Sequence, residues 1–338
     1  MKGAEDSSRK ETVTIKGNWV TYRSEIRVLD CTIRDGGLIN EHQFDDNFVK
    51  RVYKANVEAG VDYMEMGYKA DKKVFSRAKC GTWKFCDEDD IRRITGDNPT
   101  DLKLTVMADA DRTDYKQDIL PKDKSVIDVV RMAAYIHQIS SALDMVADAK
   151  QKGYQEVCLN LMAVSVVPEH ELDDALKAIM RSDVDTIYLV DSFGAFYGEQ
   201  VAHLVTKYLK AAEGTGKEVG IHTHNNQQLA YANTIEAIIR GANRVDATYA
   251  GMGRGAGNCP LDLIIGFLHN PKYHLRPVLQ CVEEIFLPMA EKMHWGYSIP
   301  YMLTGQLNQH PRAAIAQMKP ETRNKIVEFY DTLIQEIS

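Results

Sequence analysis

Eight short apolar runs alternate with amphipathic stretches between residues 26 and 270 of this chain. Near-continuous apolar runs are typical of parallel strands covered on both faces, and amphipathic stretches that end at a glycine are typical of helices. Gly60, Gly153 and Gly241 each follow such a stretch. The predicted strands span residues 26–30, 61–66, 102–107, 127–132, 156–161, 186–190, 219–223 and 244–248.

The number and spacing of these runs predict the fold. Eight strands with intervening helices in about 245 residues match a (β/α)8 TIM barrel. An open doubly wound sheet is the alternative, but no Gly-x-Gly-x-x-Gly turn follows the first predicted strand. We expect an N-terminal tail over residues 1–25, a catalytic barrel over 26–270 and a C-terminal helical extension over 271–338. The expected helices include 45–59, 141–152, 226–240, 278–293, 311–318 and 322–337, with an aromatic turn at 295–301.

Composition narrows the class of protein. Apolar residues make up 44% of the 338 residues, yet no run approaches the roughly 20 apolar residues that cross a bilayer, so we expect no membrane partner. A formal net charge of -7 without a basic stripe argues against nucleic-acid binding. Residues 1–12 lack the apolar core of a secretory signal, and the six cysteines are scattered, so we expect reduced thiols and a cytoplasmic location.

Polar residues at the ends of the first and seventh predicted strands indicate a metal site. His222 and His224 are two residues apart, so on a strand their side chains point to the same face. Asp35 follows the first strand, and the strand ends of a barrel meet at the face that carries active sites. Such a facial set of two imidazoles and one carboxylate suits Mn²⁺ or Mg²⁺, and also Co²⁺ or Zn²⁺. A His-x-His pair without the carboxylate would more often be two hydrogen-bonded polar residues.

Further candidate residues lie at other predicted strand ends. Arg34 offers planar donors beside Asp35, which suit an enolate oxygen or a carboxylate, and we expect it to pair with Glu65. The glycine-rich segment 251–258 follows the eighth strand, where barrel loops often bind anions through backbone N–H groups, although a tight turn would need the same glycines. The candidate substrate-binding residues at the ends of the sixth and eighth strands are Asp191, Ser192, Gly253 and Arg254.

These motifs resemble those of the DRE-TIM metallolyases, which include hydroxymethylglutaryl-CoA lyase, the isopropylmalate and homocitrate synthases and 4-hydroxy-2-oxovalerate aldolase. The resemblance covers about residues 26 to 310 and is closest to the aldolase branch, above all over 230–234 and 244–258. The matching motifs are Thr32-Ile33-Arg34-Asp35-Gly36, Glu65, His222-Thr223-His224 and the segment 251–258.

The resemblance implies a divalent-metal-dependent carbon–carbon lyase or aldolase that acts on a 2-oxo acid through a pyruvate-type enolate. The metal would bind Asp35, His222 and His224, with Asn258 as a further candidate ligand. Arg34 would stabilise the enolate, and Glu65 is the acidic residue of the motif. An aldehyde would be the second substrate, and the family leads us to expect a homo-oligomer and an aldehyde dehydrogenase partner.

Proton transfer is where the chain departs from the family. The aldolases have a general-base histidine three residues after the aspartate ligand, and Leu38 occupies that position here. His42, in the same loop, is the candidate replacement, with a surface or helix-capping role as the alternative. Tyr297 matches the active-site tyrosine of a Gly-Tyr turn, so we expect it to reach the pocket and shape aldehyde choice, with packing under the barrel as the alternative. The next candidate bases are Tyr68, Asp109 and Tyr297.

Three other functions stay open from the sequence. A Claisen-type enzyme that condenses an acyl-CoA with a 2-oxo acid would need a CoA groove, for which the sequence has no distinct signal. A Schiff-base aldolase would use Lys69 or Lys103. A non-catalytic barrel would have little reason to keep three inward polar residues. Cys259 follows Asn258, whereas the catalytic cysteine of the lyases precedes the matching asparagine, so we do not expect it to be catalytic.

Overall fold

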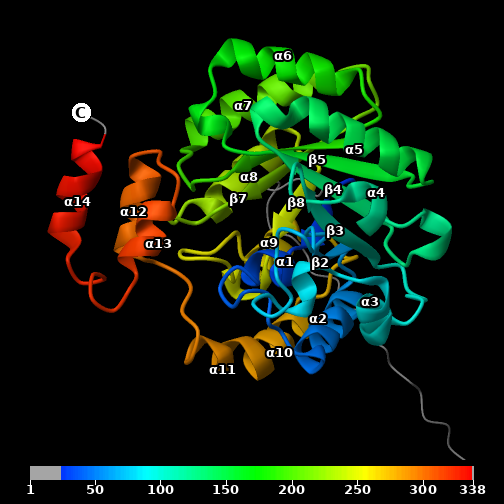
Figure 1. Ribbon diagram of the computed structural model, residues 1–338, viewed down its shortest axis with the longest axis horizontal. Coiled ribbons are helices and arrows are strands. Elements are labelled where there is room, and N and C mark those ends of the chain that lie inside the picture. The colour runs from blue at the N-terminus through cyan, green and yellow to red at the C-terminus, as the bar shows by residue number, and fades with distance from the viewer. Residues whose placement is uncertain (1–23, 337–338) are drawn as a thin grey trace, which may run out of the picture.

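The computed structural model describes residues 24–336, so nearly all of the predicted N-terminal tail lies outside the described residues. Eight parallel strands close a barrel in chain order, with helices around it (Figure 1). The predicted (β/α)8 barrel is therefore confirmed. The strands are β1 (Arg27–Asp30), β2 (Tyr63–Tyr68), β3 (Lys103–Asp109), β4 (Val129–Ala134), β5 (Glu156–Leu161), β6 (Thr186–Asp191), β7 (Glu218–Thr223) and β8 (Arg244–Ala247).

Helices follow the strands and cover the outer face of the barrel. Several of these helices begin and end at the residues that the predicted capping residues indicate. Asp45 accepts a hydrogen bond from the Phe48 N–H at 2.7 Å at the start of α2, and Gly60 ends that helix with a φ of 71°. The barrel helices are α1 (Thr32–Gly36), α2 (Asp46–Ala59), α3 (Glu88–Thr95), α4 (Tyr115–Asp118), α5 (Ile139–Gln151), α6 (Glu169–Met180), α7 (Gly198–Ala212), α8 (Ala230–Arg240) and α9 (Leu261–Leu268).

Three predicted helices differ from the structure, and the last of them, expected from residue 322, begins at Ile326. The helix expected from residue 226 begins at Ala230, because the Asn225 side chain caps its N–H at 3.1 Å and Gln228 has a left-handed backbone with a φ of 62°. The single helix expected over 278–293 is instead α10 (Leu275–Cys281), a π-helical segment (Val282–Phe286) and α11 (Leu287–Ala290). Pro288 lacks a backbone N–H, which removes one hydrogen bond of a regular helix at this point.

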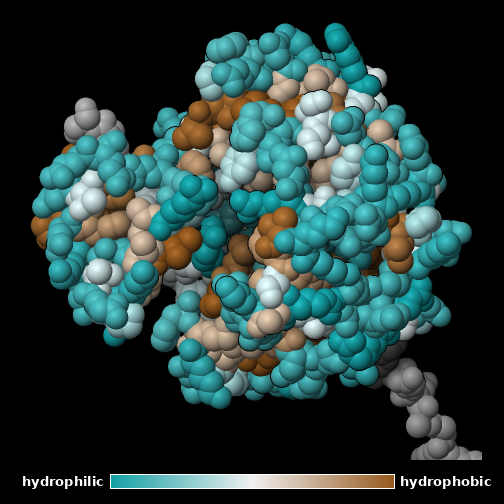
Figure 2. Space-filling view, in the orientation of Figure 1, coloured by the Kyte–Doolittle hydropathy of each residue, from teal (hydrophilic) through white to brown (hydrophobic). Residues whose placement is uncertain are grey.

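The C-terminal helices form a separate group beside the barrel (Figure 1). The expected aromatic turn at 295–301 ends inside a helix that sequence reasoning missed, α12 (Ile299–Gln306), which carries Pro300 in its first turn. Two further helices, α13 (Arg312–Gln317) and α14 (Ile326–Gln335), follow it. Figure 2 shows a mostly hydrophilic surface with a hollow near its centre, between the barrel and this group.

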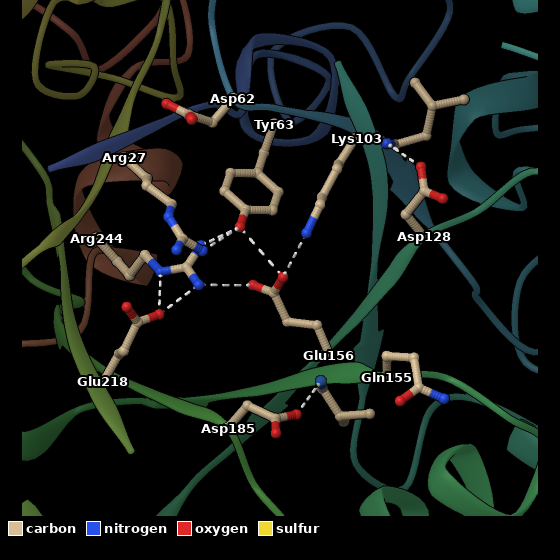
Figure 3. Close-up of polar contacts among 12 residues, drawn as sticks. Arg27, Asp62, Tyr63, Lys103, Asp128, Gln155, Glu156, Asp185, Glu218 and Arg244 are labelled. Carbon is tan, nitrogen blue, oxygen red and sulfur yellow. Dashed lines mark hydrogen bonds and ion pairs between the residues drawn. The ribbon is translucent and has the colours of Figure 1, made fainter. Parts of the chain in front are cut away.

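A layer of charges closes the barrel at the amino ends of the strands (Figure 3). Arg244 donates to Glu218 at 2.6 Å and pairs with Glu156 at 3.0 Å, and the Tyr63 hydroxyl donates to Glu156 at 3.1 Å. Lys103 pairs with the same glutamate at 3.2 Å. These residues are the first residues of five different strands, so their contacts fix the strand register at the amino end of the barrel. The candidate site lies at the opposite, carboxyl end.

Short aspartate caps repeat around that end. Three aspartates each come directly before a strand: Asp62, Asp128 and Asp185. The side chain of each accepts a hydrogen bond, at 2.7–2.9 Å, from the first free backbone N–H of a neighbouring strand. The main apolar core lies between the strands and the surrounding helices. Within residues 24–336, no helix is long and apolar enough to cross a membrane.

Candidate functional site

The turn after β1 places two charged side chains at the carboxyl end of the barrel. Asp30 accepts the Thr32 N–H at 2.9 Å, which starts the short helix α1 directly after the strand. Arg34 and Asp35 lie on that helix, and both are buried. The local sequence therefore fixes their position within one helical turn of the strand end.

The three predicted metal ligands meet at one point. Nε2 of His222 lies 3.3 Å from Oδ2 of Asp35, and Nε2 of His224 lies 3.6 Å from the same oxygen. Donor atoms that share one divalent ion at 2.0–2.2 Å lie about 3 Å apart in a facial arrangement. Both imidazole nitrogens thus lie near the same oxygen of Asp35. Among the described residues, the donor atoms that all lie within 4.8 Å of one another are those of Cys31, Asp35 and His222, and His224 lies outside this group.

The other nitrogen of each imidazole is tied to an acceptor. Nδ1 of His222 lies 3.0 Å from the carboxylate of Asp246, and Nδ1 of His224 lies 2.9 Å from the carbonyl of Asp191. Donation from both Nδ1 atoms leaves the Nε2 lone pairs facing Asp35. A lone pair aimed at a carboxylate repels it unless a cation lies between them. On His222 a second proton can fill that place, and a divalent metal would fill it for both histidines, so the donor set fits a metal.

Unpartnered atoms point to the same conclusion. Nε2 of His222, Oδ1 of Asp35 and Oδ1 of Asn258 are all buried without a hydrogen-bond partner. Asn258 donates from Nδ2 to Oδ2 of Asp35 at 2.7 Å, so its amide lies at the site with the oxygen unused. Buried polar atoms without partners are costly, and ligation would satisfy them.

A chain of buried ion pairs runs below the predicted ligands. Arg34 donates to Oε2 of Glu65 at 2.7 Å, as predicted, and Oε1 of Glu65 lies 3.0 Å from Arg131. Arg131 also donates at 2.6 Å to Oδ2 of Asp246, the oxygen that faces His222. The charges alternate in sign along this chain, so each one is compensated by its neighbours although Glu65, Arg131 and Asp246 are fully buried.

Sequence reasoning missed Arg131 and Asp246. The sequence offered a signal for each, because Arg131 follows two valines within the predicted strand 127–132, and Asp246 lies between Val245 and Ala247 within the predicted strand 244–248. The guanidinium of Arg131 stacks on the ring of Tyr188 at 4.3 Å. A Cβ atom on Gly220 would lie 2.5 Å from that ring, so a glycine in β7 makes room for the stacked pair.

The glycine-rich loop after β8 wraps around Asn258. A Cβ atom on Gly253 would lie 2.6 Å from the Asn258 amide nitrogen, and one on Gly255 would lie 2.3 Å from the ring of Tyr301. The segment therefore needs its glycines for close packing. Arg254 is half-buried beside them, and no anion contact of the loop is observed among the described residues, so its substrate role stays a prediction.

The remaining predicted site residues have different surroundings. The Asp191 carboxylate accepts the Ala195 N–H at 2.8 Å, and the Ser192 hydroxyl accepts the Ala163 N–H at 2.8 Å, so both side chains hold loops at the catalytic face. Tyr297 is 63% exposed. Tyr301, which sequence reasoning did not single out, is the buried tyrosine against the glycine-rich loop.

His42 is buried beside Asp35 and packs against the backbone of the loop between them. A Cβ atom on Gly37 would lie 2.1 Å from Nδ1 of His42, so glycine is required there. The imidazole meets the ring of Tyr68 edge-on at 5.3 Å. Burial, together with Lys84 and Arg34, lowers the pKa of His42 to about 3, so this side chain is neutral at physiological pH.

The charges also set the protonation of the ligands. Burial opposes ionisation of Asp35, but Arg34 and the two histidines hold its pKa well below its usual value. Burial alone would lower the pKa of His222, but the carboxylates of Asp246 and Asp35 raise it above the usual value. Without a metal, His222 therefore keeps a second proton to a higher pH than a free histidine does.

The cysteines are free, as expected for reduced thiols. Cys31 lies close enough to Asp35 and His222 to complete a metal-binding cluster. Its Sγ donates to the carbonyl of Ala247 at 3.4 Å, and burial raises the pKa of the thiol well above the usual value, so it enters the site as a neutral neighbour. Burial raises the pKa of Cys259 to about 12, which disfavours a reactive thiolate there.

The two Schiff-base candidates do not point to that chemistry. Lys69 is buried and donates to the carbonyl of Cys86 at 2.6 Å. Lys103 lies at the opposite end of the barrel in the charge layer of Figure 3.

A groove of about 1000 Å³ runs between α6 and α7 on the outer surface of the barrel. None of the predicted metal ligands lines this groove, so it is separate from the candidate site.

Asp246 is expected to tune metal affinity through His222. The substitution Asp246→Asn removes the charge that orients the imidazole, and we expect the affinity for Mn²⁺ to fall about 10- to 100-fold. Glu156→Gln is the matched control, because it neutralises a carboxylate paired with an arginine at the other end of the barrel. Titration of free Mn²⁺ by electron paramagnetic resonance measures both. Equal losses in the two variants would contradict the role of Asp246.

The raised pKa of His222 predicts a pH-dependent metal affinity. Metal binding must displace the Nε2 proton, whereas Asp35 is already ionised because its pKa is depressed. Below the pKa of His222, the apparent Mn²⁺ affinity should therefore fall by about tenfold for each unit of pH decrease. Above that pKa it should become constant. A pH-independent affinity between pH 5 and pH 8, measured by calorimetry, would contradict this assignment.

Comparison with known proteins shows the family of this chain. A family model described as HMGL-like matches residues 25–280. Oxaloacetate decarboxylase of Mycobacterium tuberculosis is 30% identical over 263 residues, which cover 76% of this chain and 74% of the relative. 4-Hydroxy-2-oxovalerate aldolase of Pelotomaculum thermopropionicum is 30% identical over 252 residues, which cover 74% of this chain and 72% of the relative.

Solved structures give the same grouping. The N-terminal domain of a Bacteroides vulgatus protein described as an aldolase matches with a TM-score of 0.74 and 28% identity, over 88% of this chain and 98% of that one. The HMG-CoA lyase of Bacillus subtilis matches with a TM-score of 0.63 and 17% identity, over 80% and 96%, which shows a shared fold. The resemblance predicted from the motifs is confirmed. The chain belongs to the HMGL-like family and is an enzyme of the aldolase and lyase class.

Proposed function

We propose that this protein is a divalent-metal-dependent aldolase or lyase that cleaves a carbon–carbon bond of a 2-oxo acid through a pyruvate-type enolate. The observation that carries the proposal is the convergence of His222, His224 and Asp35, with both histidine Nδ1 atoms tied back and Arg34 beside them. The relatives named 4-hydroxy-2-oxovalerate aldolase support a substrate of this class. We expect Mn²⁺ or Mg²⁺ as the native metal, with Co²⁺ or Zn²⁺ as alternatives.

The reaction is a retro-aldol cleavage. The proton of the 4-hydroxyl leaves, the C4–O bond becomes a carbonyl, and the C3–C4 bond breaks. The aldehyde departs while the electron pair remains in the enolate, which then takes a proton at C3 to give pyruvate. A bound divalent cation would supply positive charge beside the 2-oxo group, which lowers the energy of the enolate.

Arg34 supplies the protein's own stabilisation of that charge. Its guanidinium is held by Glu65 at 2.7 Å and by Asp35 at 3.1 Å, so it is oriented before substrate binds. Preorganised donors in a buried site stabilise a developing oxyanion without a cost of reorganisation at the moment of reaction. Glu65 acts here by aiming the guanidinium, because Arg131 and Arg34 occupy its two oxygens.

Asp109 is a better candidate for the general base than His42. Burial lowers the pKa of His42 to about 3, which makes it a weak base. Burial raises the pKa of the Asp109 carboxyl, although Lys84 and Arg34 oppose the rise. Asp109 ends β3 at the catalytic face, and its carboxylate has no hydrogen-bond partner within residues 24–336. A carboxylate with a raised pKa suits proton abstraction near neutral pH.

Metal binding and activity should be lost together when a ligand is removed. With Mn²⁺, we expect the wild type to release pyruvate from 4-hydroxy-2-oxovalerate and to exchange the methyl protons of pyruvate in D₂O. His222→Ala should lose the bound metal and both activities, because it removes a ligand. His203→Ala, in an exposed histidine of α7, is the control and should retain all three. Equal metal content in the two variants, by elemental analysis, would refute the metal site.

The base assignment has its own test. Asp109→Asn should lower the turnover number for cleavage by about 10²- to 10⁴-fold, the range for loss of a general base. His42→Gln should have a smaller effect. The control is Asp111→Asn, because Asp111 accepts hydrogen bonds from Gln138 and Ser141 close by. Steady-state rates with 4-hydroxy-2-oxovalerate would rule out Asp109 if His42→Gln proved the more damaging change.

The predicted partners stay predictions. Exposed apolar side chains on the C-terminal helices, among them Ile315, Val327 and Tyr330, offer contact area for a second protein. Light scattering measures whether the chain forms the expected homo-oligomer, and co-purification tests the expected aldehyde dehydrogenase partner. Tyr297, at 63% exposure, is near that group in sequence, and its proposed role in aldehyde choice is tested by Tyr297→Phe kinetics.

A further inference from the structure

The loop between β2 and α3 carries a lysine that the proposed reaction does not use. Lys84 ends a short 3-10 helix, Thr82–Lys84, and its side chain is half-buried. Its Nζ lies 4.1 Å from the centroid of the Tyr68 ring and 4.6 Å from that of Phe75. Within residues 24–336, no carboxylate lies within ion-pair distance of this ammonium group. Two aromatic faces hold it in place without neutralising its charge.

The same tyrosine ring links this lysine to the catalytic face. The Tyr68 ring contacts Lys84, lies 6.0 Å from the guanidinium carbon of Arg34 and meets the imidazole of His42 at 5.3 Å. Tyr68 itself ends β2, three residues after Glu65, the partner of Arg34. Two cations therefore border one aromatic ring, and one of them is the residue proposed to hold the enolate.

The two cations differ in how they are compensated. Arg34 has both Glu65 and Asp35 as ion-pair partners. Burial lowers the pKa of Lys84, and longer-range attraction, chiefly to Asp109 with smaller contributions from Cys80 and Glu41, opposes that lowering. An ammonium group that is partly removed from water and lacks a bound anion is costly, and an anionic ligand would remove that cost.

We propose that Lys84 is the binding residue for an anionic group on the aldehyde half of the substrate. This inference rests on the proposed retro-aldol function. A substrate whose 2-oxo acid end lies beside Arg34 extends past Tyr68, and a carboxylate or phosphate at its far end then meets Lys84. The substrate class is accordingly a 4-hydroxy-2-oxo acid with a second anionic group beyond C4. Both Arg34 and Lys84 border the Tyr68 ring, at 6.0 Å and 4.1 Å from its centroid.

The test compares aldehydes in the addition direction, with pyruvate and Mn²⁺. The carboxylated arm sets succinic semialdehyde against pentanal, and the phosphorylated arm sets glyceraldehyde 3-phosphate against glyceraldehyde. In at least one arm, the wild type should show a kcat/KM ratio of anionic to neutral aldehyde above about tenfold, as expected for a partly buried charge contact. The arm with the larger ratio identifies the anion.

Variants then assign the preference to the lysine. Lys84→Met should bring that ratio close to one, mainly through KM for the anionic aldehyde, whereas Lys84→Arg should retain most of it. Lys79→Met removes an exposed lysine of the same loop and should leave the ratio unchanged. Thermal unfolding of all three variants checks that they are folded. A ratio that Lys84→Met leaves unchanged, or a wild type without preference in either arm, overturns the inference.

Exchange of the pyruvate methyl protons in D₂O tests the proposed aldolase function separately from the anion site at Lys84. That exchange needs the enolate but no aldehyde. A wild type that catalyses exchange yet prefers neutral aldehydes would overturn the anion site and leave the aldolase proposal intact. A wild type without exchange at saturating Mn²⁺ would overturn both.

Discussion

The alternation of charge from Arg34 through Glu65, Arg131 and Asp246 to His222 is the interaction on which the site depends. It crosses the barrel interior and joins side chains from, or directly after, five strands. Removing one member of a buried ion pair typically costs about 3–5 kcal/mol, because the partner is left uncompensated. This row of alternating charges is therefore complete only when the strands are paired in their native register. Closure of the barrel and assembly of the catalytic groups are one event.

This arrangement separates stability from chemistry along the barrel axis. At the amino ends of the strands, Arg244 and its partners form a charge layer that is satisfied within the protein. At the carboxyl ends, Nε2 of His222 and Oδ1 of Asn258 are buried without a hydrogen-bond partner. Natural barrels keep conserved stability features at the first end and catalytic groups at the second. Buried polar atoms without a hydrogen-bond partner are tolerated where a bound ligand contacts them.

Small residues let the charged groups reach their positions. Gly220 makes room for Tyr188, which stacks on Arg131, and Gly37 makes room for His42. In both cases a side chain on the glycine would collide with the ring that supports the site. Leu38, where the aldolase pattern has a histidine, belongs to the same loop as Gly37 and His42. Lys84 borders the Tyr68 ring, and the proposed roles of Asp109 and Lys84 both concern the aldehyde half of the substrate.

The sequence by itself determined the barrel, the approach of His222 and His224 to Asp35, and the pairing of Arg34 with Glu65. These follow from local rules: apolar runs of strand length, glycines after helices, and the alternation that puts His222 and His224 on one face. Only the tertiary structure decided which groups compensate one another. Arg131 and Asp246 are 115 residues apart in the chain and meet because the barrel closes. Tyr301, rather than Tyr297, packs on the glycine-rich loop because α12 starts where a turn was expected. Such contacts depend on the summed geometry of several elements, and no local pattern of residues encodes them.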